Sequence, residues 1–146
     1  MLTYSPAVPG DAAVLFQLNK QLIDAYEDTD TIDYDRVLNW VSHNIEENLT
    51  HFVRVWRGSR LVAYYCLMPS DGKWELDSLF VLPECRGQGI GTAILRKCQQ
   101  EAESALFLYV FRRNTGAVAL YQKMGFRIVK EVGNTRYIME YQNQGC

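Results

Sequence analysis

The stretch from Trp74 to Glu103 constrains the fold more than any other, because a strand, a glycine-rich loop and a helix follow one another there directly. Trp74–Val81 is mostly apolar with polar interruptions, which is typical of a strand that rests one face on a core. Pro83 ends this strand, since proline has no N–H for a sheet ladder. The loop Arg86–Gly91 then leads into a helix predicted over Thr92–Glu103. The sequence therefore predicts a loop of exposed backbone at a helix N-terminus.

This loop has the composition of an anion-binding site. Gly87, Gly89 and Gly91 carry no Cβ atoms that would block a ligand, and glycine readily adopts positive φ, so that successive N–H groups can point inward. The unpaired N–H groups of a helix's first turn and its macrodipole favour phosphate or pyrophosphate at this position. Arg86 adds a positive charge.

Two common nucleotide motifs do not fit the loop. The dinucleotide fingerprint needs a third glycine three places after the second, and Thr92 occupies that place. A Walker A loop needs Gly-Lys-Ser/Thr, and the loop lacks it. The pattern that remains is Arg-x-x-Gly-x-Gly behind a strand that ends at Pro83.

That pattern resembles the acyl-CoA-binding motif of the GNAT superfamily of N-acetyltransferases. A second block strengthens the resemblance, because a predicted strand from Leu106 is followed by the family's Asn-x-x-Ala-x-x-x-Tyr-x-x-x-Gly-Phe pattern. The residues that match this second block are Asn114, Ala117, Tyr121, Gly125 and Phe126. The resemblance is good from about Trp74 to Phe126 and tapers in both directions.

Periodicity and turn signals along the chain predict an α/β (α+β) fold with a mixed sheet. About seven mostly antiparallel strands are flanked by four helices, with one βαβ unit, in a single domain over residues 1–146. Asp11 is the expected N-cap of the first helix. The strands are predicted over residues 3–8, 51–56, 61–68, 74–81, from 106 to about 110, 126–132 and 135–141, and the helices over 11–26, 35–48, 92–103 and 115–124. The GNAT fold has the same order of elements.

The resemblance implies where acetyl-CoA binds. In similar proteins the two parallel strands splay apart, and the pantetheine arm lies in the gap like an extra strand. Backbone groups of Leu79, Phe80 and Val81 would pair with pantetheine. Asn114 would either cap its helix or touch the CoA arm. The residues that would hold the pyrophosphate are Arg86, Gly87, Gln88, Gly89, Ile90, Gly91 and Thr92.

Transfer of an acetyl group to an amine requires a base, because an ammonium group has no lone pair with which to attack. Glu75 and Asp77 alternate along the predicted strand and so project to one face. Position 75 matches the place where family members often carry a glutamate that acts as base, which favours Glu75 over Asp77. The alternative is that both carboxylates merely face solvent.

Tyr121 is the candidate acid, since similar proteins place this tyrosine's hydroxyl near the thioester sulfur. A phenol of ordinary pKa is protonated at neutral pH and can donate to the departing thiolate. The alternative role is an aromatic of the core, because Leu120, Met124 and Phe126 are close in sequence.

Charge and composition exclude several classes of function. With 146 residues and a net charge of −2, the chain has no general attraction for nucleic acid or an anionic membrane. No apolar run approaches the roughly 20 residues of a membrane span, and Met1–Tyr4 does not resemble the start of a signal peptide. The cysteines are too widely spaced for a metal motif, and we expect free thiols, no metal and a cytoplasmic location. They are Cys66, Cys85, Cys98 and Cys146.

The acceptor amine is less constrained. Six acidic residues and no basic one lie between Asp24 and Asp35, a segment that borders the acceptor cleft in similar proteins. They either attract a small cationic amine or cap a helix and solvate a loop. The acids are Asp24, Glu27, Asp28, Asp30, Asp33 and Asp35.

Three functions are compatible with the sequence. The first is an acetyl-CoA-dependent N-acetyltransferase of a small amine, and the second is an acetyltransferase of protein N-termini or lysines. The third is an acyl-CoA-binding regulatory module without turnover, against which the presence of both Glu75 and Tyr121 argues. Small domains of this kind are often dimers, and the segment Tyr137–Tyr141 is a candidate for pairing across a homodimer.

Overall fold

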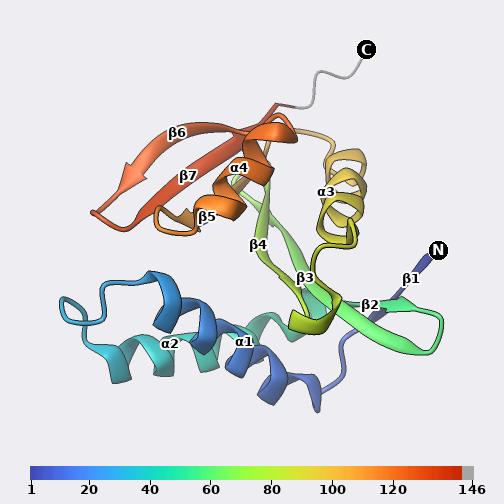
Figure 1. Ribbon diagram of the computed structural model, residues 1–146, viewed down its shortest axis with the longest axis horizontal. Coiled ribbons are helices and arrows are strands. Elements are labelled where there is room, and N and C mark those ends of the chain that lie inside the picture. The colour runs from blue at the N-terminus through green and yellow to red at the C-terminus, as the bar shows by residue number, and fades with distance from the viewer. Residues whose placement is uncertain (143–146) are drawn as a thin grey trace.

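The computed structural model describes residues 1–142, which form one seven-stranded sheet with helices on both faces (Figure 1). The strand order is β1-β2-β3-β4-β5-β7-β6, and every neighbouring pair is antiparallel except β4 and β5. This confirms the predicted mixed sheet and its single βαβ unit. The elements are β1 (Leu2–Pro6), α1 (Asp11–Tyr26), α2 (Tyr34–Asn48), β2 (Phe52–Arg57), β3 (Arg60–Ser70), β4 (Lys73–Val81), α3 (Ile90–Glu101), β5 (Leu106–Phe111), α4 (Thr115–Lys123), β6 (Arg127–Val132) and β7 (Arg136–Tyr141).

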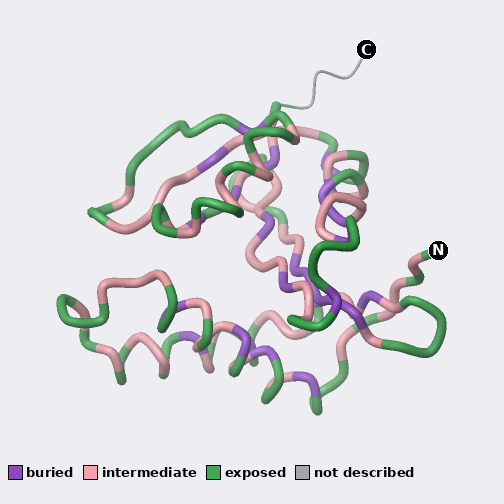
Figure 2. The backbone as a smooth tube through the Cα atoms, viewed as in Figure 1, coloured by how far each residue is buried: buried purple, intermediate pink, exposed green. Residues whose placement is uncertain are grey.

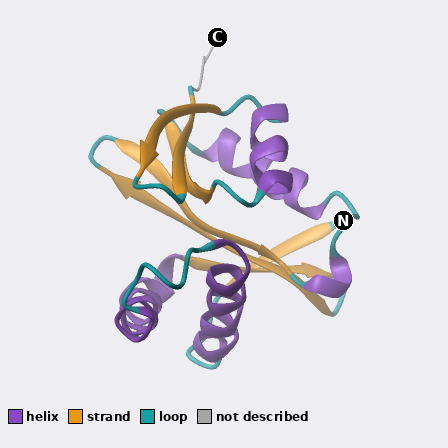
Figure 3. Ribbon diagram, turned by 60° about the vertical axis from the view of Figure 1, so that its left-hand side comes forward, coloured by secondary structure: helices purple, strands orange, loops and turns teal. Residues whose placement is uncertain are grey.

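The sheet separates two apolar cores, with α1 and α2 on one face and α3 and α4 on the other (Figure 3). Strand β3 contributes to both because successive side chains of a strand point to opposite faces. Ala63 and Tyr65 join the core under α3, whereas Tyr64 and Cys66 join the core under α1 and α2. In Figure 2 the buried backbone accordingly concentrates where the helices meet the central strands.

Strands β4 and β5 pair only briefly and then diverge. Their registered pairs are Trp74 with Leu106 and Glu75 with Phe107. Beyond that point β4 continues along β3 to Val81, and β5 continues along β7. Beyond these two pairs, the edge of β4 that faces β5 and the edge of β5 that faces β4 are both unpaired. This is the splay of the two parallel strands that the GNAT resemblance implies.

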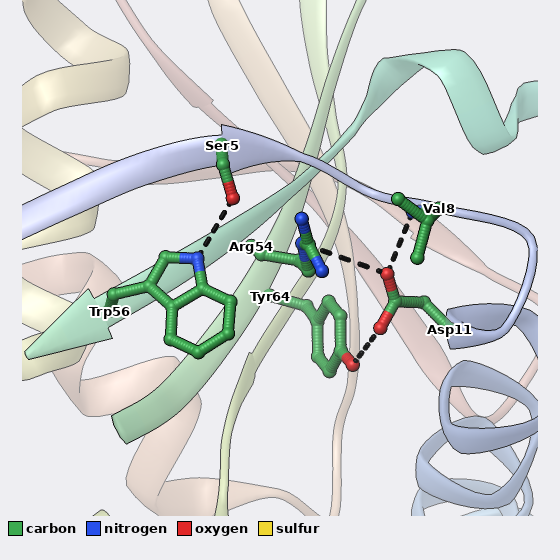
Figure 4. A network of polar contacts seen from close by, with 6 residues as sticks. All are labelled: Ser5, Val8, Asp11, Arg54, Trp56 and Tyr64. Atoms are coloured by element: carbon green, nitrogen blue, oxygen red, sulfur yellow. Dashed lines mark hydrogen bonds and ion pairs between the residues drawn. The ribbon is translucent and has the colours of Figure 1, made fainter. Parts of the chain in front are cut away.

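Asp11 lies inside the first turn of α1, so its expected role as N-cap is wrong. Gly10 is the N-cap residue and makes no side-chain cap. The Asp11 carboxylate instead accepts hydrogen bonds from the Val8 N–H (2.8 Å) and the Tyr64 hydroxyl (2.6 Å), with Arg54 Nε at 3.8 Å (Figure 4). A buried carboxylate needs several partners, and these tie α1 to β2 and β3.

Two further expectations are corrected by the fold. Helix α3 begins at Ile90, two residues before Thr92, because Gly89 already provides its N-cap. Tyr137–Tyr141 cannot pair across a dimer as an edge strand, since β7 is hydrogen-bonded to β5 on one side and β6 on the other. The edges of the sheet are β1 and β6.

Candidate active site

The glycine loop turns sharply into α3 through two residues of left-handed backbone. Gly87 has φ +77° and Gly89 has φ +79°, a region that L side chains rarely adopt. Gly89 is the N-cap of α3 and supplies no side-chain cap, so the first N–H groups of the helix project from its end. A Cβ added at either glycine would meet no atom within 4 Å, so their surroundings leave room for a ligand. This loop has the donor set of a pyrophosphate cradle.

The start of α3 lies against the end of β4 and against α4. A Cβ added at Gly91 would be 3.8 Å from Val81 Cγ2 and 3.8 Å from Leu120 Cδ2. The side chain of Ile90 is only 2% exposed and anchors the first turn in the core. Ile90 and Gly91 can therefore contribute backbone N–H groups to a ligand, while their positions are fixed by packing.

Two arginines lie at this loop. Arg86 Nε donates to Val81 O (3.1 Å), which holds the guanidinium over the end of β4. Arg57, at the end of β2, donates from Nη1 to Gln88 Oε1 (2.5 Å). Arg57 was not expected from the sequence, because it lies far from the loop in the chain and comes close to it only when the sheet has folded.

The unpaired edge of β4 presents regularly spaced backbone donors to the gap. Leu79, Phe80 and Val81 are registered with Tyr65, Tyr64 and Ala63 of β3. Leu82 N–H donates to Val62 O (2.9 Å), and hydrogen bonds alternate along an antiparallel ladder. The N–H groups of Leu79 and Val81 therefore point away from β3 and toward the gap, where an extended ligand can pair with them.

Glu75 and Asp77 lie on the sheet face that α1 and α2 cover, as their spacing predicts. Glu75 is registered with Met68, which packs into that core. The charges of Glu75 and Asp77 both contribute to the raised pKa of the buried Cys66 thiol. Burial and, second, the charge of Asp77 raise the pKa of Glu75 to about 7. Burial also raises the pKa of Asp77, against the effect of hydrogen bonds from Ser78 and Asn44. A carboxyl group that titrates near neutrality is suited to general base catalysis.

Tyr121 lies on α4 and packs partly buried against the core under α3 and α4, with its ring centroid 5.8 Å from that of Phe126. Burial raises its pKa to about 12, so the phenol keeps its proton at neutral pH. The ring of Tyr121 thus packs as a core aromatic, and its hydroxyl group still keeps a proton.

Asn114 caps α4, since its Oδ1 accepts from Ala117 N–H (3.3 Å). The capping role that the sequence left open is therefore present in the structure, and it positions Asn114 between the end of β5 and the start of the helix that carries Tyr121.

The acidic connection between α1 and α2 uses several of its carboxylates locally. Asp24 accepts from Tyr34 Oη (2.6 Å) and from Lys20 Nζ (2.9 Å), which lowers its pKa. Asp33 caps α2 by accepting from Arg36 N–H (3.2 Å). Asp28 accepts from Asp30 N–H (3.3 Å). Asp24, Thr29 and Tyr34 line an open depression beside these groups.

The three cysteines in the described part of the chain, Cys66, Cys85 and Cys98, are free and buried. Cys146, also expected to be a free thiol, lies outside the described residues. Over residues 1–142, no cluster of histidine, cysteine and carboxylate side chains could hold a metal ion. None of the helices described there is long and apolar enough to cross a membrane.

Comparison with known proteins identifies a family model that matches residues 15–126, described as the acetyltransferase (GNAT) family. Among curated relatives, an uncharacterized N-acetyltransferase, YobR of Bacillus subtilis, is 32% identical over 84 residues, which are 55% of this chain and 34% of the relative. The peptidyl-lysine N-acetyltransferase YiaC of Escherichia coli is 34% identical over 76 residues, which are 51% of this chain and 49% of the relative. The chain thus matches about a third to a half of these relatives' lengths.

Solved structures share the fold over nearly the whole chain. An acetyltransferase from Thermus thermophilus has a TM-score of 0.73 at 20% identity, covering 97% of both chains. The PaiA N-acetyltransferase from Thermoplasma acidophilum, solved in complex with coenzyme A, has a TM-score of 0.71 at 18% identity and covers 97% of this chain and 99% of that one. At such low identity these similarities establish the fold alone.

Proposed function

Because the chain belongs to the GNAT family of acetyltransferases, we propose that it transfers an acetyl group from acetyl-CoA directly to a primary amine. The observation that carries the proposal is the divergence of β4 and β5 after Glu75 and Phe107, with the glycine loop at the end of the gap. An extended thiol carrier with a pyrophosphate at one end fits a strand edge that leads to an anion cradle.

The donor half of the proposed site consists mainly of backbone. Leu79 and Val81 would pair with the pantetheine arm, as the directions of their N–H groups support, whereas Phe80, whose N–H points to β3, would not. The residues that would hold the pyrophosphate are Arg86, Gly87, Gln88, Gly89, Ile90, Gly91 and Thr92. Left-handed φ at Gly87 and Gly89 and the open space around them support this fit. When bound, acetyl-CoA supplies an activated acyl group on a good leaving group.

The protein's own groups would move two protons. Glu75 would take a proton from the acceptor ammonium group, directly or through water, so that the nitrogen lone pair can attack. A carboxyl pKa near 7 supports this role at neutral pH. Tyr121 Oη would donate a proton to the sulfur as the thiolate departs, and its elevated pKa means that the proton is present. Asn114, which caps the helix of Tyr121, would touch the CoA arm.

The acceptor that we favour is a small cationic amine. Asp24–Asp35 carries six carboxylates, and their field would raise the local concentration of cations. A lysine-bearing peptide is the second candidate, because two relatives, YiaC of Escherichia coli and YjaB of Salmonella typhimurium, are peptidyl-lysine N-acetyltransferases. The local hydrogen bonds of Asp24, Asp28 and Asp33 leave both candidates open.

We also propose a cytoplasmic location. Three buried cysteines are free, and free thiols are usual in proteins of reducing compartments.

A thiol-release assay tests the proposed reaction. Acetyl-CoA is incubated with the protein and with polyamines, an aminoglycoside, or lysine-bearing and free N-terminal peptides, and acetylated product is identified by mass spectrometry. We expect release of CoA thiol that depends on one class of amine, and calorimetric heat with acetyl-CoA alone. Heat without turnover on any acceptor would instead support the regulatory module, and absence of both would overturn the proposal.

A further inference from the structure

Strand β4 contains a bulge at Asp77. Cys66 of β3 is registered with Ser78 and Leu67 with Leu76, so Asp77 is the extra residue without a registered partner. A bulge redirects the side chain of the residue that it frees from the ladder. The carboxylate of Asp77 meets α2 and accepts hydrogen bonds from Asn44 and from Ser78 Oγ, the latter at 3.1 Å.

The orientation of the Asn44 amide is fixed from within α2. Asn48 Nδ2 donates to Asn44 Oδ1 (2.9 Å) and also to Asn44 O (3.0 Å). Because Asn44 Oδ1 is the acceptor of that bond, its Nδ2 group is the one directed at Asp77, and a carboxylate that accepts such a bond is favoured in its ionised form. The chain of donors therefore runs from Asn48 through Asn44 to Asp77.

The ionisable groups around Glu75 on this face come from several strands. Asp77 lies on its own strand, and the buried Cys66 thiol, whose pKa is raised, lies on β3. On the other side, Glu140 of β7 is registered with Phe107, the β5 neighbour of Glu75, and pairs with Lys73 Nζ (2.6 Å). The neutral Asn44 faces the site from α2. The negative charge of Glu140 is thus balanced by the positive charge of Lys73. The side chains that donate hydrogen bonds to Asp77 are neutral and do not balance its charge.

We propose that Asp77 is a positioning residue, which Asn44 and Ser78 hold ionised so that its charge makes Glu75 the carboxyl group that accepts a proton from the acceptor amine. This inference rests on the proposed function, which it deepens by dividing the roles of two adjacent carboxylates. It also makes α2 part of the catalytic arrangement, since Asn44 reaches the pair from that helix. Like charges close together raise the proton affinity of one member of the pair.

The test is a pair of variants with a titration that does not depend on turnover. In Asp77→Asn, removal of the neighbouring charge lowers the Glu75 midpoint, measured by ¹³C NMR of its carboxyl carbon, by about one pH unit. In Asn44→Ala, the Asp77 midpoint rises and the Glu75 midpoint falls by a smaller amount. In the double variant, Asn44→Ala adds nothing further to Asp77→Asn, because its effect acts through the carboxylate at position 77.

Asp71→Asn is the matched control. It removes one carboxylate from the turn before β4, where the residue has φ +48°, a conformation that asparagine tolerates. We expect no change in the Glu75 midpoint there. If the protein catalyses acetyl transfer, the acidic limb of its pH profile of kcat/KM must move with the NMR midpoint of Glu75 in each variant. If the Glu75 midpoint is the same in wild type and in Asp77→Asn, the inference is overturned. If the NMR shifts occur but the protein does not catalyse acetyl transfer, the proposed reaction is overturned and the electrostatic role of Asp77 stands.

Discussion

At the scale of single residues, Glu75 and Tyr121 are both partly buried, and burial raises the pKa of each side chain. Both residues stand at positions that the family resemblance marks. The chain neighbours alone do not reveal these properties, because burial is the largest cause of both shifts and depends on how strands and helices pack together. Asp11 illustrates the same limit, since an acid before an apolar run suggests a cap, whereas tertiary contacts use it as a buried acceptor.

Replacing Tyr121 with phenylalanine tests whether its hydroxyl acts in the reaction or only packs. Tyr121→Phe keeps the ring against Phe126 and removes the proton donor. We expect kcat to fall about 10²-fold, at the low end of the range for acid–base help, while the Kd for CoA changes little. Steady-state kinetics and calorimetry measure the two quantities separately. Equal turnover in the variant would leave Tyr121 as a residue of the core.

The raised pKa of Glu75 predicts a pH-dependent cost in stability. The folded-state pKa, about 7, lies above the ordinary value, so the stabilising contribution is complete below pH ~4.3 and is lost as the pH rises through about 7. Glu75→Gln removes this loss. After allowance for solvent screening, we expect the variant to be more stable than wild type by about 1 kcal/mol at pH 8, with the difference vanishing near pH ~4.5.

Urea denaturation at the two pH values measures this difference. Glu103→Gln, at an exposed position, is the control and should alter stability equally little at both. A Glu75→Gln variant whose stability relative to wild type does not depend on pH would show that the carboxyl group is not desolvated.

At the scale of elements, periodicity was sufficient for most helices and strands, because their apolar patterns agree with the faces that they bury; β6, which is exposed from Arg127 to Glu131, buries no such face. The pattern of Val41 and Ile45 in α2, for example, matches the core it joins. Register was less accessible. The bulge at Asp77 and the reach of Arg57 to Gln88 depend on which strands lie side by side, and neither leaves a local signal. The start of α3 was misplaced because Gly89 and Gly91 weaken helical propensity where the helix in fact begins.

Substitution of Gly89 tests whether the loop geometry serves binding. Gly89→Ala forces an L side chain into φ +79° and perturbs the N-terminus of α3. We expect a loss of about 1 kcal/mol in stability and, in addition, at least roughly tenfold weaker CoA binding by calorimetry. Gly133→Ala, at φ +57° in the turn between β6 and β7, carries similar strain away from the loop. Comparable CoA affinity in the two variants would mean that the loop does not form the pyrophosphate site.

At the scale of the whole molecule, the sheet consists of two parts whose backbones meet at only two registered pairs. Strands β1 to β4 form one part and β5, β7 and β6 the other, joined at Trp74–Leu106 and Glu75–Phe107. The core under α3 and α4 spans both parts. A ligand that pairs along β4 would therefore give hydrogen-bond partners to the unpaired backbone groups of this strand. The two parts of the sheet would already be held together by side-chain packing.

This arrangement gives a residue-resolved prediction for amide hydrogen exchange. In the free protein, the N–H groups of Leu79 and Val81 point into the gap and should exchange rapidly, whereas that of Phe80, on the β3 side of the same ladder, should be protected. With CoA at about 100 times its Kd, exchange of Leu79 and Val81 should slow by up to about 100-fold, because they would exchange only from the unbound fraction. NMR-detected exchange in both states measures all three amides, and Phe80 should be protected in each. If Leu79 and Val81 are already protected in the free protein, or still exchange rapidly at saturation, the carrier does not pair along this edge, and the acyl group must reach Glu75 by another route.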